Sequence, residues 1–235
     1  MSNYAELSKK LMDALGLRTE PVAVTLIKKG QSIPEGYNTV EGPTRHCQSI
    51  MRARKGESLC VPMEKNACPV GASALGETPL PEKVRSGEFH FNMGMYESQG
   101  AAAVTISVRP AMPAGSTIAT VVSPLSQARI EPDVVIVVGL PEQAFWIIPA
   151  AQTFEKGGRV TVEMAAVQAA CVDSTVIPID KKHVNISLGC FGCRKTSDIQ
   201  PEEMLIGIPW SMFEKTVEAV EKMAQGPIPK SRAKA

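Results

Sequence analysis

Two cysteines three positions apart dominate the chemistry that this sequence can support. They lie in the stretch SLGCFGCRKT, where glycines flank Cys190 and Cys193 and two cations follow. Because a tight turn brings positions i and i+3 together, both sulfurs can bind one metal ion or one cluster. We therefore expect Cys190 and Cys193 to be metal ligands. The expected cofactor-binding residues are Gly189 and Gly192, which let the backbone bend, and Arg194, which offsets thiolate charge.

Two thiolates do not fill a four-ligand centre, so further ligands must come from elsewhere in the chain. The candidates are Cys47, Cys171 and Cys68, the last followed by Pro69 as in known cluster loops. Zinc ribbons and fingers need two close ligand pairs, whereas this chain has one. The spacing therefore favours an iron–sulfur cluster, of the 4Fe-4S type, over zinc. Cys60 lies between two apolar residues in a strand-like pattern and is the expected non-ligand.

The cysteines also fit three alternatives, namely structural zinc, a redox dithiol and simple packing. A thioredoxin-like dithiol follows a strand and begins a helix. Residues 184–188 supply the strand, but residues 194–198 are a poor helix opening. The alternative function is a non-catalytic accessory protein that binds a small anion near Arg45, Arg52 and Arg54. The sequence leaves open whether the protein is an enzyme.

Composition predicts a cytoplasmic protein. The chain is 44% hydrophobic and 21% charged, and its net charge of +1 argues against a nucleic-acid surface. It has no run of about 18 apolar residues and no signal-peptide core, so we expect no membrane insertion. In a reducing cytosol, six cysteines are not expected to form three disulfides. The partners left open are a small molecule, a redox partner and a second copy in a homo-oligomer.

The elements that must position these residues mix strands and helices, which predicts an α/β or α+β fold. Runs of β-branched and apolar residues predict strands at 22–27, 102–108, 118–122, 134–138, 160–162, 184–188 and 205–208. Helical spacing of apolar residues predicts helices at 4–15, 47–54, 68–75, 141–154, 164–170 and 210–223.

A faint internal repeat adds an expectation about architecture. The pattern Arg-x-Glu-Pro followed by a β-branched run begins at Arg18 and again at Arg129. Further matches follow in the same order, and they make Cys68 equivalent to Cys171. They predict a duplicated unit of roughly 100 residues whose copies pack about a pseudo-twofold axis. We treat residues 1–235 as one domain with halves of about 1–110 and 111–235.

Several motifs together resemble a known family. They are Arg45-His46-Cys47, Arg54-Lys55-Gly56-Glu57, Cys68-Pro69-Val70-Gly71, Gly157-Gly158, Cys171 and Leu188-Gly189-Cys190-Phe191-Gly192-Cys193-Arg194. This set resembles the domain-of-unknown-function family numbered 169, which is met in archaea and anaerobic bacteria. The resemblance implies no activity, because the family has none assigned. Its anaerobic setting would suit an oxygen-sensitive cluster.

Overall fold

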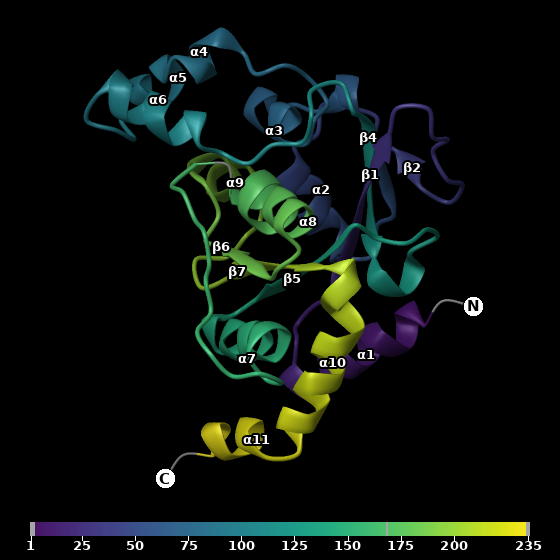
Figure 1. Ribbon diagram of the computed structural model, residues 1–235. Helices are drawn as coiled ribbons and strands as arrows, with labels where there is room; N and C mark the ends of the chain where they lie inside the picture. The colour runs from purple at the N-terminus through teal and green to yellow at the C-terminus, as the bar shows by residue number, and fades with distance from the viewer. Residues whose placement is uncertain (1–2, 168, 234–235) are drawn as a thin grey trace.

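A computed structural model describes residues 3–167 and 169–233, and in these residues one seven-stranded sheet lies between two layers of helices (Figure 1). The strands are β1 (Val22–Lys28), β2 (Asn38–Thr39), β3 (Leu59–Pro62), β4 (Thr117–Pro124), β5 (Val134–Gly139), β6 (Asn185–Ser187) and β7 (Met204–Pro209). Their order is β2-β3-β4-β1-β5-β7-β6. Only β2 and β3 are parallel among these neighbours, so the fold is mixed α/β, as the sequence predicted at that level.

The central strands are buried on both faces because helices cover both sides of the sheet. Side chains alternate across a strand, so Val22 and Val24 of β1 enter one hydrophobic cluster and Ala23 enters the other. In β5, Ile136 and Val135 divide between the same two clusters. The β-branched runs that predicted these strands therefore fill two separate cores.

Each face of the sheet has its own helices. One cluster contains residues of α1 (Tyr4–Leu15), α7 (Pro141–Gln152) and α10 (Trp210–Ala224). The opposite face carries α2 (His46–Ala53), the π-helix η3 (Ala169–Val176), α8 (Ile177–Lys181) and α9 (Phe191–Thr196). Figure 1 shows the two groups on opposite sides of the strands. The five cysteines predicted as metal ligands lie on the α2 and η3 side.

A group of short helices extends this second layer at one end of the molecule (Figure 1). It contains α3 (Pro69–Ala74), α4 (Glu82–Arg85), α5 (Glu88–Asn92) and α6 (Gln99–Ser107). We call α4 to α6 the cap. The remaining helices are η1 (Met63–Lys65), η2 (Leu125–Gln127) and α11 (Pro227–Arg232). None of the helices in the described residues is long and apolar enough to span a membrane.

The strand predicted at residues 102–108 is wrong, because most of that segment belongs to helix α6. Ser98 caps the helix by accepting a hydrogen bond from the Ala101 amide at 3.1 Å. Only Ala102 and Ile106, four residues apart, are buried, whereas Val104 is 64% exposed. The three alanines favour a helix, and burial one turn apart fixes its face.

The short strand at 160–162 and the helix at 164–170 are also wrong. Residues 160–167 form neither helix nor strand, residue 168 lies outside the described residues, and the π-helix begins at Ala169. A side chain holds the segment instead. The Glu163 amide donates to Asn185 Oδ1, and Asn185 Nδ2 donates to the Glu163 carbonyl, both at 2.8 Å. One amide side chain from β6 thus replaces the strand pairing that the sequence suggested.

The two halves of the sheet follow the same plan on either side of the central β1–β5 pair. From the centre outward the orders are β1-β4-β3 and β5-β7-β6, antiparallel throughout, with β2 added at the edge of the first half. Val22 pairs with Pro124 in β4, and Val134 pairs with Pro209 in β7. The first residue of β3 and that of β6 each pair with the residue two positions before the proline. Strand order, direction and register therefore agree between the halves.

This agreement relates different cysteines from those that the sequence repeat had paired. Cys68 is the N-cap of α3, after β3, and Cys190 is the N-cap of α9, after β6. Cys171, the expected counterpart of Cys68, lies inside the π-helix. Cys68 and Cys190 thus share a local position, because each caps the short helix that follows the outer strand of its half, although Cys68 lies six residues after β3 and Cys190 three residues after β6. Cys47 lies on α2, which precedes β3, and Cys171 lies on the π-helix, which runs into α8 before β6, and both helices pack on the same face of the sheet.

Candidate functional site

A cavity of about 400 Å³ lies between α2, α3, the cap, the π-helix and α9. The five cysteines that the sequence predicted as ligands all line it, and they come from four separate elements. They are Cys47, Cys68, Cys171, Cys190 and Cys193. The sixth, Cys60, is fully buried in β3 against Ile27 and Val121 and does not line the cavity. The apolar strand environment predicted for Cys60 is confirmed.

Cys68 and Cys190 occupy the same local structure. Each is a helix N-cap in extended backbone conformation, and its sulfur accepts a hydrogen bond from the amide three residues later. The Gly71 amide lies 3.3 Å from Cys68 Sγ, and the Cys193 amide lies 3.4 Å from Cys190 Sγ. An amide that points at a sulfur would orient that sulfur as a ligand.

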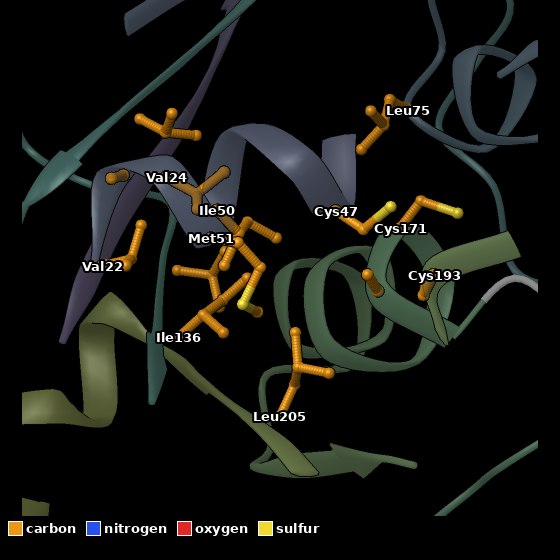
Figure 2. Packing of buried hydrophobic residues seen from close by; sticks show 14 of the residues in the cluster. Val22, Val24, Cys47, Ile50, Met51, Leu75, Ile136, Cys171, Cys193 and Leu205 are labelled. Carbon is orange, nitrogen blue, oxygen red and sulfur yellow. The ribbon is translucent and has the colours of Figure 1, made fainter. Parts of the chain in front are cut away.

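Cys193 lies close to two other thiols. Its Sγ is 3.3 Å from Cys190 Sγ, and it also contacts Cys47, which approaches from α2. The contact with Cys190 lowers the pKa of Cys193, but the contact with Cys47 and burial outweigh it and raise that pKa to about 12. Figure 2 shows Cys47, Cys171 and Cys193 at one end of a buried hydrophobic cluster. At neutral pH, Cys193 is therefore a protonated thiol.

Cys171 projects from the π-helix, a rare conformation that is frequent at functional sites. Burial, followed by the nearby thiols of Cys68, Cys193 and Cys190, raises the pKa of Cys171 well above its ordinary value. The π-helix packs directly against β7. The contact is so close that a Cβ at Gly207 would overlap the backbone carbonyl of Ser174. A glycine in the strand thus lets the helix carrying Cys171 approach the sheet.

His46 connects α2 to the π-helix and is neutral. Burial lowers its pKa to about 4. Thr175 Oγ1 donates its one proton to the Ala170 carbonyl at 2.7 Å, so His46 Nε2, 2.9 Å from that oxygen, must carry a proton and donate. His46 Nδ1 is then a bare acceptor, and it has no hydrogen-bond partner among the described residues.

The residues expected to bind a cofactor around Cys190 have two different roles. Gly192 lines the cavity, whereas Gly189 and Arg194 do not. Arg194 turns away and donates to the backbone carbonyls of Leu188, Gln200 and Glu203. Gly189 has φ +80°, and a side chain there would meet Arg194 Nε at 2.9 Å. Arg194 and Gly189 therefore shape the loop that carries Cys190 and Cys193.

The three arginines considered for anion binding separate in the structure. Arg45 lines the cavity, but Arg52 forms an exposed ion pair with Glu57 at 2.6 Å. Arg54 is buried and pairs with Glu203 at 2.8 Å. That buried pair joins the end of α2 to the segment after α9, and so it positions two cysteine-bearing elements relative to each other.

Sequence reasoning missed the apolar wall of the cavity. Phe89, Met93 and Met95 come from α5 and the residues after it, and Phe191 from α9. The available signal was a dense run of aromatic and methionine residues in an otherwise polar segment. His90, Lys195, Val70 and Val167 complete much of the remaining lining.

The segment after Cys193 forms a helix, which the sequence did not predict. Helix α9 begins at Phe191, so a strand, the Cys-x-x-Cys pair and a short helix follow one another. This removes the local objection to a redox dithiol. Among the residues that the structure describes, no three His, Cys, Asp or Glu side chains are grouped as they would be around one metal ion.

Fold and site together define a mixed α/β protein with a thiol-lined cavity, and sequence comparison gives its family. The profile of the DUF169 family, described as "Uncharacterised ArCR", matches residues 10–219. The chain belongs to this family, so the resemblance seen in the motifs is confirmed. It is similar to the uncharacterized protein MJ0308 of Methanocaldococcus jannaschii, with 34% identity over 228 residues, 96% of this chain and 97% of that protein. No solved structure matches the chain.

Proposed function

We propose that the cavity holds an iron–sulfur cluster of the 4Fe-4S type, bound by four cysteine thiolates. The observation that carries this proposal is that five cysteines, brought from four separate elements, line one largely buried cavity. Packing alone gives no reason for five of six cysteines to meet in one place. Cys60 is the contrasting case, because it is buried singly among apolar side chains. The arrangement suits soft, thiolate-liganded centres.

The residues fit a cluster better than a single ion. Ligands around one zinc ion lie close together at bond lengths of about 2.3 Å, and no such group exists in the described residues. A cluster is several atoms wide, so cysteines from several elements around one cavity can hold it, and the five cysteines here come from four elements. The protonated Cys171 and Cys193 would release protons on binding if they ligate.

A bound cluster would supply one-electron transfer, or cluster-based chemistry on a small molecule. The chain's own contribution would be to hold the sulfurs, to direct amides at Cys68 and Cys190, and to limit water. The apolar side chains of the cap and Phe191 line the same cavity as the cysteines. Solvent access and amide hydrogen bonds are the levers by which a protein tunes such a centre.

The matching halves of the sheet support a duplicated scaffold and, from it, a ligand set. In this proposal Cys68 and Cys190 form one related pair, and Cys47 and Cys171 form the other. Cys193 has no counterpart, because the equivalent position after Cys68 is Gly71. We therefore assign Cys47, Cys68, Cys171 and Cys190 as ligands, which leaves Cys193 as an additional thiol. The Cys-x-x-Cys pattern alone would have included Cys193.

The experiment is purification of the full chain without oxygen. We expect a brown protein that absorbs broadly near 400 nm and contains iron and acid-labile sulfide. A colourless preparation with about one zinc per chain would overturn the proposal and favour the accessory protein with structural zinc. A colourless, metal-free protein whose Cys190 and Cys193 oxidise reversibly would favour the dithiol, for which their sulfur separation of 3.3 Å is the supporting observation.

A further inference from the structure

We propose that the part of the cavity between the cysteines and the cap binds a small organic acid with an apolar body. Its carboxylate would contact Arg45 and Lys195, and its body would lie against Phe89, Met93 and Phe191. The acid would be the substrate of the proposed cluster, and that part of the inference rests on the proposed function. The binding of the acid itself rests on the cations and walls described below.

The charges around the cavity favour an anion. Arg45 and Lys195 line it, and within the described part of the chain neither forms an ion pair. Neighbouring cations do, since Arg52, Arg54 and Lys55 each contact a carboxylate. The described lining contains no aspartate or glutamate. An entering carboxylate would meet two cations and no carboxylate of the described lining.

The walls favour an apolar body over a bare inorganic anion. Phe89 is 41%, Met93 38% and Phe191 52% exposed, so three large apolar side chains remain uncovered around one opening. Lys195 Nζ lies 5.6 Å from the centre of the Phe191 ring, which places a cation beside the apolar wall. The whole cavity, which would also hold the proposed cluster, has a volume of about 400 Å³, within the roughly 300–1,000 Å³ of small-molecule sites.

A buried histidine adds a polar group that a ligand could satisfy. His90 lines the cavity and is 4% exposed, and its Nδ1 has no hydrogen-bond partner among the described residues. Burial lowers the pKa of His90, so the ring is neutral at pH 7. Few polar groups among apolar walls are typical of a site that fixes a small molecule's orientation.

The test is calorimetric titration of the full-length, anaerobically purified protein with benzoate, benzamide and inorganic phosphate. We expect benzoate to bind and benzamide to bind at least about tenfold more weakly, because it lacks the charge. Phosphate should also bind at least about tenfold more weakly than benzoate, because it lacks the apolar body. Lys195→Met and Arg45→Met should each weaken benzoate binding by about tenfold. Arg52→Met, whose partner is Glu57 outside the cavity, is the matched control and should leave binding unchanged.

Equal affinity for benzoate and benzamide, or benzoate binding that survives both cavity variants, would overturn the inference. So would phosphate binding as tight as benzoate binding. Iron and sulfide are assayed on the same samples, so the two proposals fail separately. Full iron content without benzoate binding would refute the acid site alone, whereas charge-dependent benzoate binding without iron would refute the cluster alone. Lys195 is exposed, so its variant tests the site even if Arg45→Met fails to fold.

Discussion

The two halves of the sheet share strand order, direction and register, yet they contribute different things to the cavity. In the first half, residues 63–116 separate β3 from β4 and include the cap and its apolar wall. In the second half, only residues 188–203 separate β6 from β7, and they carry the extra thiol of Cys193. A similar strand framework can therefore support an asymmetric site, because the chemistry lies in the connections between the strands.

The cysteine loops of the two halves are also held by opposite kinds of group. In the first half, Asn66 Oδ1 accepts from the Cys68 amide, and Asn66 Nδ2 donates to the buried carboxyl of Glu77. In the second half, the guanidinium of Arg194 donates to backbone carbonyls on both sides of the loop. The Asn66–Glu77 support is neutral or anionic, whereas the Arg194 support is cationic. We therefore expect the two loops to respond differently to pH and to substitution.

The largest expected effect comes from breaking the buried link between the halves. Arg54→Met should lower the free energy of unfolding by about 3–5 kcal/mol, because it leaves Glu203 buried without its partner. The measurement is urea denaturation followed by circular dichroism. Arg52→Met, which breaks the exposed pair with Glu57, is the control and should cost about 1 kcal/mol or less. Equal losses in the two variants would contradict the role given to Arg54.

A smaller effect is expected where the π-helix rests on the second half. Gly207→Ala should lower the free energy of unfolding by about 3 kcal/mol, because its Cβ would overlap the Ser174 carbonyl. Gly42→Ala is the control, since nothing lies within 4 Å of the Cβ it would add. Stability of Gly207→Ala within about 0.5 kcal/mol of the parent would show that the π-helix does not rest on β7 as described.

The smallest effect tests the carboxyl support of the first half. Burial, partly offset by hydrogen bonds from Asn66 and Thr120, raises the pKa of Glu77 to about 7. Between its ordinary value of 4.5 and 7, the folded state therefore binds more protons than the unfolded state. Stability from this group is complete below about pH 4.5 and is lost as pH rises through about 7.

Glu77→Gln should remove that loss. We expect it to be more stable than the parent at pH 8 by up to about 3 kcal/mol and similar near pH 4.5. Urea denaturation of both proteins between pH 4.5 and 8 gives the comparison. Parallel stability profiles for Glu77→Gln and its parent would refute the raised pKa.

Sequence patterns predicted those parts of the fold where one signal dominated. β-branched runs located β1, β4, β5 and β7, and helical spacing located α1 and α10 within a residue or two. Residues 102–108 failed because alanine-rich apolar sequence fits a strand or a helix, and the Ser98 cap with one-sided burial decided for the helix. The π-helix around Cys171 has no local sequence signature, because the space it packs into on β7 depends on Gly207, which is distant in sequence.

The candidate site was foreseen in part. The Cys-x-x-Cys spacing and the positions of the other cysteines singled out the five cysteines that line the cavity. Cys60 was set apart correctly as a buried strand residue. The role of Arg194 was not foreseen, because its charge suggested a cofactor contact while its hydrogen bonds go to backbone carbonyls. The apolar wall depends on how the cap folds over α9, which no local pattern encodes.

Iron and acid-labile sulfide per chain, measured on anaerobically purified cysteine-to-serine variants, decide whether the cavity holds the cluster. We expect Cys68→Ser and Cys190→Ser to lose most of both, because each removes a ligand thiolate, while Cys60→Ser keeps them. We also expect Cys193→Ser to keep the cluster, since the counterpart of Cys193 is Gly71. Loss in Cys193→Ser would replace the paired ligand set by one that includes both cysteines of the Cys-x-x-Cys motif. Iron and sulfide that survive in Cys68→Ser and Cys190→Ser alike would contradict the account.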